Sequence, residues 1–311
     1  MRASHASDRS HGTDGAHQHA ADRWLRAVPC LALLHALLLF VLYRRPGLPA
    51  VVLWHIGPAA LTIAAVLVMV YGLRRSTRAR LTWTARRAAG FASLAAISAM
   101  PLTYGTYPSS RDRLPSQVRF RLPLDGPVTV RWGGPTRAVN YHAFAPPERW
   151  AYDLFVTQGQ RSARGEGKQL TDYHAYGLPV LAPSAGAVRI VSDGAPDTPL
   201  GSRGGWRNAC GNHVAIDVAP GEYLFLCHLQ AGSIRVGPGD PVIAGQQIGR
   251  VGNSGRSTEP HLHVHLQTTL DVEFGEGIPL FFHGYRHEGH LVERGMPTGG
   301  RSPQTVEHGG S

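Results

Sequence analysis

The chain has 311 residues, of which 43% are hydrophobic and only 17% are charged, against roughly 25% charged in a typical soluble protein. Its 31 basic and 21 acidic side chains give a net charge of +10, and its three cysteines are too few for a dense disulfide scaffold. Residues 1–110 contain 12 arginines and 3 aspartates, so the excess positive charge belongs to the apolar N-terminal third. A fully soluble enzyme and a wholly disordered chain are excluded, and contact with a lipid bilayer is favoured over nucleic acid.

Apolar stretches follow a polar leader at 1–23, which we expect to be disordered and cytoplasmic. A membrane domain is predicted at 24–107, with spans at about 27–43, 51–71 and 88–104. The first two are long enough to cross a hydrocarbon core of about 30 Å at about 1.5 Å per residue. The third is rich in small residues and is either a third span or a surface helix.

Arginines predict the orientation of these spans. The segment 72–87 contains six arginines, which is typical of a cytoplasmic loop. With about three spans, everything after residue 104 would lie on the extracytoplasmic side of the cell membrane. The sequence therefore predicts a multi-pass membrane protein with an exported C-terminal part.

Short alternating apolar runs begin after a Pro/Ser/Arg linker at 108–117. Clusters of glycine and proline separate these runs through 118–293, which favours an all-β domain, either an antiparallel sandwich or a barrel. The segments 177–188 and 239–249 share a G-x-P-V-[LI]-A core, as expected of a duplicated β-hairpin barrel. Biotinyl and lipoyl carriers share that pattern, but the single lysine, Lys168, is poorly placed for a carrier. Residues 294–311 are expected to form a flexible tail.

The strongest local signal is a glycine-rich approach at 252–260 that ends in His261, His263 and His265. Alternate side chains of a strand share one face, so the three imidazoles would point the same way. Imidazole is a good zinc ligand, and this spacing can deliver a ligand and a neighbouring catalytic group. The other reading is a solvated strand face in a chain with 17 histidines.

At these residues the sequence resembles the lysostaphin/LytM-type zinc metallopeptidases, which cut peptide bonds in bacterial cell-wall peptidoglycan. The matching pieces are the G-x-P-V turn at 177–188, Cys-His-Leu at 227–229, G-D-x-V-x-x-G-Q-x-I-G at 239–249, and the motif ending in His-Leu-His at 261–263. The resemblance implies a duplicated hybrid barrel with one Zn²⁺ per chain and peptidoglycan peptides as substrate. It makes His263 a zinc ligand and His228 and His261 the catalytic histidines.

Two further ligands, a histidine and an aspartate, should come from upstream of the first G-x-P-V turn. His142 and Asp153 match in order, although ten residues separate them where the family usually has three. His213 and Asp217 have the short spacing but follow that turn, so His142 and Asp153 are preferred. For His174 and His265, two alternatives remain open: a role beside the metal site or in contact with substrate, or an ordinary surface position.

The implied chemistry needs two imidazoles and one carboxylate on zinc, with a fourth position open for water. No H-E-x-x-H glutamate and no G-x-S-x-G nucleophile occur in the chain, so His228 and His261 would handle the protons. A non-catalytic, wall-binding or hydrolase-activating domain is the runner-up function. A membrane sensor is a third reading, disfavoured because no cytoplasmic output domain is visible. The sequence does not specify the bond that is cut, a regulatory protein or the oligomeric state.

Cys210 and Cys227 lie in the predicted exported part, where a disulfide is permitted. A hairpin that turns at Pro220 and Gly221 would bring position 227 closer to 214 than to 210. A bridge would require an irregular strand, so the regular pattern slightly disfavours it.

Overall fold

The computed structural model describes residues 22–45, 47–79, 81–205 and 208–309. The chain divides into two compact units, Met1–Tyr104 and Gly105–Ser311. The predicted disordered leader falls outside the described residues, except for its last two positions. Those two, Asp22 and Arg23, begin a short 3-10 helix.

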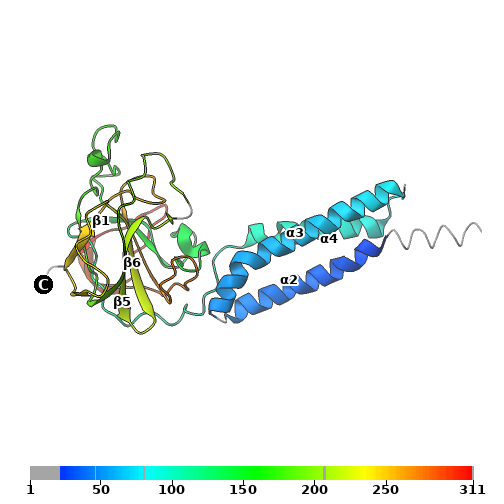
Figure 1. Cartoon of the computed structure of the whole chain (residues 1–311), viewed down its shortest axis with the longest axis horizontal. Coiled ribbons are helices and arrows are strands. Elements are labelled where there is room, and N and C mark those ends of the chain that lie inside the picture. The colour runs from blue at the N-terminus through cyan, green and yellow to red at the C-terminus, as the bar shows by residue number, and fades with distance from the viewer. Residues whose placement is uncertain (1–21, 46, 80, 206–207, 310–311) are drawn as a thin grey trace, which may run out of the picture. The chain divides into compact units, whose positions relative to one another are not determined.

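The first unit is helical (Figure 1). Two of its helical segments, Asp22–Arg44 and Leu48–Arg78, are long and apolar enough to cross a membrane, as predicted for the first two spans. Leucine, valine and alanine dominate both segments, and most of their apolar side chains face outward, away from the protein. The helices are η1 (Asp22–Arg26), α2 (Ala27–Arg44), α3 (Leu48–Arg78), α4 (Ala85–Ala99) and η2 (Met100–Thr103).

The third predicted span is not confirmed. Helix α4 has 15 residues, about 22 Å of helix, which is short of a hydrocarbon core of about 30 Å. Its small residues bring it close to its neighbours: a Cβ at Gly90 would lie 2.3 Å from the Leu25 side chain, and Thr62 of α3 donates to the Ser98 carbonyl. The prediction that small residues would pack this segment against other helices therefore agrees with the structure.

The second unit is a mostly antiparallel β domain, as expected. Ten strands form one sheet in the order β11-β10-β12-β1-β2-β9-β6-β5-β4-β7, and β3 pairs with β8 in a separate ribbon. The strands are β1 (Val128–Trp132), β2 (Tyr152–Phe155), β3 (Pro179–Leu181), β4 (Gly186–Ser192), β5 (Asn212–Ala219), β6 (Glu222–Leu229), β7 (Pro241–Val242), β8 (Gln247–Arg250), β9 (Leu262–Gln267), β10 (Phe282–His287), β11 (His290–Gly295) and β12 (Thr305–His308).

Alternation along β9 decides which side chains face the core. Leu262, Val264 and Leu266 are buried in the main hydrophobic cluster. The histidines between them lie on the opposite face, so the strand separates apolar packing from polar chemistry. The neighbouring strand β6 repeats the pattern, with Leu224 and Leu226 in the same core.

The two G-x-P-V segments interlock. Strand β3 of the first segment pairs with β8 of the second, while β7 of the second pairs with β4 of the first. Each segment thus completes the other's strand pairing. The two similar sequences therefore pair with each other in two places.

The C-terminal stretch is more ordered than the composition suggested. Strand β12 pairs with both β1 and β10, and Val306 is buried. Residues 305–308, part of the segment expected to be a flexible tail, form a strand that pairs with β1 on one side and β10 on the other. The predicted linker also belongs to the β domain, since Ser109 and Ser110 bind Glu276.

Cys210 and Cys227 form a disulfide with a Cα–Cα distance of 5.0 Å, contrary to the regular-hairpin expectation. The hairpin does turn at Pro220 and Gly221, but the register between β5 and β6 shifts near Asn212. This irregularity places Cys210 beside the end of β6, where its carbonyl accepts a hydrogen bond from the backbone N–H of the residue after Cys227.

Candidate metal centre

Three side chains with metal-binding atoms meet where β2 and β9 pair. His142 lies in η3 (Tyr141–Phe144), Asp153 lies in β2, and His263 lies directly opposite Asp153 in β9. Their ligand atoms are all within 4.8 Å of one another, and all three side chains are buried. Segments more than a hundred residues apart in the chain therefore supply one donor set.

This donor set fits zinc. Two ligands held about 2 Å from zinc at tetrahedral angles lie about 3.3 Å apart. Nδ1 of His263 is 2.9 Å from Oδ1 of Asp153, and Nε2 of His142 is 3.6 Å from Oδ2 of Asp153. Two imidazoles and one carboxylate are also a common set for catalytic zinc, which keeps a fourth position for water or substrate.

Asn140 orients the His142 ring. Its Oδ1 accepts hydrogen bonds from the backbone N–H and from Nδ1 of His142, at 3.1 and 3.0 Å. Because its Nδ2 donates to the carbonyls of Gly134 and Ala151, the amide orientation is fixed. An amide oxygen can only accept, so Nδ1 of His142 carries the proton and Nε2 is left free for a metal.

The electrostatics favour an ionised carboxylate at the centre. Burial opposes ionisation of Asp153, but the nearby His142 and His261 hold its pKa well below the usual value. Burial lowers the pKa of His142, which favours its neutral, metal-binding form. For His263, burial is outweighed by the hydrogen bond to Asp153 and the charge of Glu148, which raise its pKa, so a proton and a metal compete for this ring.

His228 reaches the cluster through an irregular backbone. Its φ of 63° lies in the left-handed region, where a non-glycine residue is uncommon and often functional. Its Nδ1 is 2.9 Å from the Ser254 carbonyl, which again makes Nδ1 the donor and leaves Nε2 free. The ring lies 4.8 Å from that of His261 and 5.8 Å from that of His263. Burial and these two rings hold the pKa of His228 well below its usual value.

His261 is oriented in the same manner. Its Nδ1 is 2.8 Å from the Glu259 carbonyl, and its Nε2 is 3.6 Å from Oδ1 of Asp153. The ring stacks on Phe155 at 4.7 Å, with only 2° between the planes. Two imidazoles, His228 and His261, therefore lie beside the three metal-binding groups, each with its Nδ1 held by a backbone carbonyl.

Two glycines allow the backbone of the 254–255 turn to contact the backbone at residue 211, just before β5. Gly211 and Gly255 both have positive φ, and a Cβ on Gly255 would lie 2.4 Å from the Gly211 nitrogen. The glycine-rich approach to the histidine motif thus allows the 254–255 turn to pack against the start of β5. Ser254 in that turn supplies the carbonyl that holds His228.

Sequence reasoning did not assign several neighbours of the cluster. Tyr141 packs its ring 3.9 Å from that of His142, and its hydroxyl lies 3.4 Å from Asp153. Phe155, Asn140 and Tyr141 are within two residues of a proposed ligand, so adjacency in the chain was the available signal. His265, left open by the sequence, is buried with its Nδ1 3.1 Å from Nε2 of His263, whereas His174 lies in a half-buried loop.

The alternative pair, His213 and Asp217, belongs to no metal-binding group among the described residues. Asp217 forms an ion pair with Arg189 on the neighbouring strand β4. His213 Nδ1 contacts the Gly211 carbonyl. The short spacing thus occurs in an ordinary sheet strand.

Comparison with known proteins finds a family match within the β domain. Residues 167–273 match the model of Peptidase family M23. This match covers about a third of the chain. The match includes His228, His261 and His263, while His142 and Asp153 lie before it. No curated protein sequence matches the chain.

Solved structures that match part of this chain include three proteins. A zinc containing peptidase from Vibrio cholerae is 22% identical over 48% of this chain and 36% of its own, with a TM-score of 0.32. The catalytic domain of lysostaphin from Staphylococcus simulans is 21% identical over 48% of this chain and 86% of its own, with a TM-score of 0.29. A mutant catalytic domain of the prophage-encoded M23 protein EnpA from Enterococcus faecalis is 26% identical, covering 40% and 92%, with a TM-score of 0.26. The chain therefore spans about a third of the Vibrio protein that it resembles.

Proposed function

We propose that this chain is a membrane-anchored zinc endopeptidase that hydrolyses peptide bonds in cell-wall peptidoglycan. The observation that carries the proposal is the convergence of His142, Asp153 and His263 within 4.8 Å. The M23 match over 167–273 supports the same reaction class.

Each side chain has a distinct task in this proposal. His142, Asp153 and His263 hold the ion; zinc, when bound, polarises the scissile carbonyl and lowers the pKa of a water molecule. The free nitrogens of His228 and His261 accept the proton of the attacking water and return a proton to the leaving amine. Their hydrogen bonds to carbonyls keep both rings in the required tautomer.

The helical unit supplies the anchor and an orientation. Asp22 pairs with Arg87 near the start of α4, whereas Tyr104 stacks on Trp54 near the start of α3. The described chain therefore enters this unit at one end of α3 and leaves it at the other. With the arginine-rich end in the cytoplasm, α4 and η2 together form a third crossing, and the β domain lies on the extracytoplasmic side, where peptidoglycan is found.

The test uses the full chain purified in detergent. We expect about one zinc per chain and release of peptide fragments from isolated peptidoglycan. His142→Ala and His263→Ala should lose both zinc and fragment release. His290→Ala, an exposed histidine on β11, is the matched control and should lose neither.

A further variant separates an enzyme from a non-catalytic wall-binding or activating protein. His261→Ala should retain zinc and lose fragment release. If the unaltered chain binds zinc but releases no fragments, the peptidase proposal is wrong.

A further inference from the structure

One end of the helical unit carries many more arginines than acidic side chains. Between residues 22 and 104 the chain has a single acidic side chain, Asp22. Arg87 occupies it: Nε and Nη2 of the buried guanidinium donate to the two carboxylate oxygens, at 2.8 and 3.1 Å. No other acid remains in this segment to balance the surrounding arginines.

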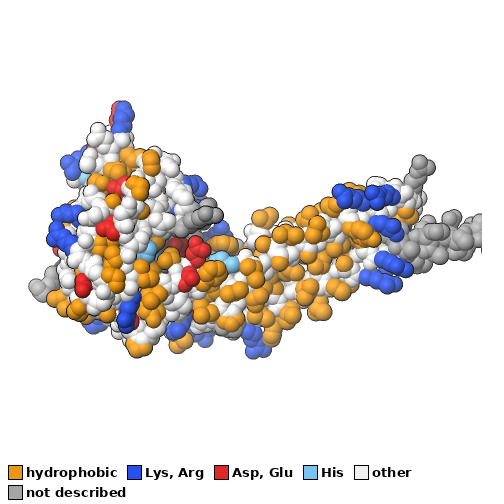
Figure 2. Space-filling view, viewed as in Figure 1, with side chains coloured by type: hydrophobic (Ala, Val, Ile, Leu, Met, Phe, Trp, Pro, Cys, Tyr) orange, Lys and Arg blue, Asp and Glu red, His pale blue; other side chains and the backbone are white. Residues whose placement is uncertain are grey.

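The other arginines of this end that the structure describes are exposed, and none forms an ion pair with a described residue. They lie in η1, in the last two turns of α3 and in the first turn of α4. These are Arg23, Arg26, Arg74, Arg75, Arg78 and Arg86. Figure 2 shows basic side chains gathered at this end, next to a mostly hydrophobic helical surface. The leader at 1–21 contributes two arginines and two aspartates, so it supplies no net negative charge.

Packing holds together the helix ends that carry these arginines. Trp24 is buried between α3 and α4: a Cβ at Gly72 would lie 2.7 Å from its ring, and Phe91 lies 4.6 Å from it. The Asp22–Arg87 ion pair also joins η1 to α4. The end of the unit is thus a built structure that displays six cations.

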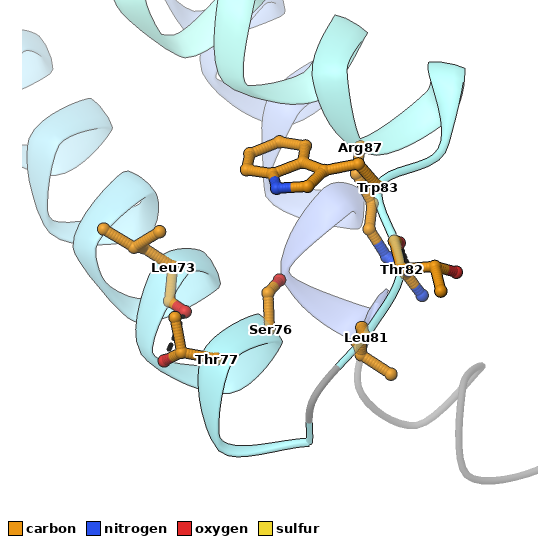
Figure 3. A pocket seen from close by; sticks show the side chains of 7 residues that line it. All are labelled: Leu73, Ser76, Thr77, Leu81, Thr82, Trp83 and Arg87. Atoms are coloured by element: carbon orange, nitrogen blue, oxygen red, sulfur yellow. Dashed lines mark hydrogen bonds between the residues drawn. The ribbon is translucent and has the colours of Figure 1, made fainter.

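A hollow of about 120 Å³ lies beside these cations (Figure 3). Its lining consists of Leu73, Ser76, Thr77, Leu81, Thr82, Trp83 and Arg87. The Oγ of Ser76 points into this space, is buried and has no hydrogen-bond partner among the described residues. Trp83 is 68% exposed at the rim, a position typical of tryptophan at a membrane–water interface.

We propose that this end of the helical unit is a binding site for anionic phospholipid headgroups. The six exposed arginines supply the counter-charge for headgroup phosphates, and the hollow beneath Trp83 accepts part of one headgroup. Basic clusters next to membrane spans attract anionic lipids in this manner. The inference requires that the helices lie in a bilayer, and it is independent of the peptidase activity.

The test measures lipid selectivity of the full chain in vesicles that contain phosphatidylglycerol and phosphatidylcholine. Spin-labelled analogues of each lipid report the fraction immobilised by the protein. We expect a clear preference for phosphatidylglycerol. Substitution of Arg74, Arg75 and Arg78 by Gln should reduce that preference at least tenfold at low ionic strength, since each basic residue contributes about fivefold.

A matched triple variant controls for net charge. Arg119→Gln, Arg286→Gln and Arg301→Gln remove three exposed arginines of the β domain and should leave the preference unchanged. Ser76→Leu fills the hollow and should weaken the preference without changing the charge. Soluble glycerol phosphate should not compete at millimolar concentration, since a membrane-held headgroup is favoured by its anchoring.

Three results would overturn the proposal: no preference in the unaltered chain, an unchanged preference in the Arg74/Arg75/Arg78 variant, or an equal loss in both triple variants. Fragment release from peptidoglycan is measured on the same samples. It should be unchanged by all of these variants, which separates a failure of the lipid site from a failure of the proposed peptidase.

Discussion

Asn140 is the side chain on which the orientation of His142 depends. It is fully buried and joins the ligand loop to the start of β2 through its contacts with His142 and Ala151. We expect Asn140→Ala to lower zinc affinity about 10- to 100-fold, the usual cost of losing a partner of a metal ligand. Competition with a chromophoric chelator measures the affinity. Gln117→Ala, which removes an exposed side-chain amide, should not alter it; an unchanged affinity in Asn140→Ala would mean that His142 is held by its packing alone.

His265 supports the other imidazole ligand. When Nδ1 of His263 faces the metal, its Nε2–H points to Nδ1 of His265 at 3.1 Å, and the His265 ring stacks on Phe225 at 4.9 Å. His265→Phe keeps the stacking but removes the acceptor, so zinc affinity should fall by about tenfold or more. His265→Gln restores an acceptor and should recover part of the loss. Equal affinities in the two variants would limit His265 to packing.

At the scale of the elements, a disulfide joins Cys210, just before β5, to Cys227 in β6. It closes a loop with a sequence separation of 17 residues. Constraint of the unfolded chain by a loop of this size contributes about 3 kcal/mol. Cys210→Ala together with Cys227→Ala should therefore lower the free energy of unfolding of the β domain by about 3 kcal/mol, measured by urea titration of the detergent-solubilised chain. Cys30→Ala removes the exposed free cysteine and should have little effect; an equal loss in both would point to the detergent state instead of the bridge.

Elements were predictable from the sequence where a local pattern determines the structure. The alternation in β9 predicted that its histidines share one face, and Leu262 and Val264 lie on the other face, in the core. The apolar runs of α2 and α3 were long enough to be recognised. The disulfide was missed because it depends on the register shift between β5 and β6, a tertiary irregularity that regular spacing does not contain. The ordered segment around Val306 was missed because its pairing with β1 joins residues far apart in the chain.

The candidate site also has residues that the sequence predicted and residues that it could not predict. The histidine motif and the upstream His142 and Asp153 came from residue type, order and resemblance, and the structure brings these side chains together. Asn140 and His265 could not be assigned, because their contacts require the three-dimensional positions of both rings. The short His-x-x-x-Asp spacing of His213 and Asp217 did not identify the metal ligands, since Asp217 forms an ion pair with Arg189.

At the scale of the whole molecule, the first residues after the helical unit are tied to the ligand loop. The backbone N–H of Tyr107 donates to the Ala143 carbonyl, next to His142, and Arg149 donates to the Tyr107 carbonyl. Buried Glu276 accepts hydrogen bonds from the Ser109 hydroxyl and from Ser110. The segment that follows the helical unit therefore contacts Ala143 and Arg149, which lie in the chain between the proposed ligands His142 and Asp153.

Loss of the Glu276 carboxylate should loosen this attachment. Glu276→Ala leaves the Ser109 and Ser110 donors without their acceptor, so we expect cleavage by trypsin after Arg111 and Arg113 to become at least tenfold faster. Zinc affinity should fall by a smaller factor than in Asn140→Ala, because the effect reaches His142 only through Tyr107 and Ala143. Glu293→Ala, an exposed carboxylate on β11, is the matched control and should leave cleavage and zinc affinity unchanged. Faster cleavage with an unaltered zinc affinity would show that the metal-binding loop holds its shape independently of the segment that joins it to the helices.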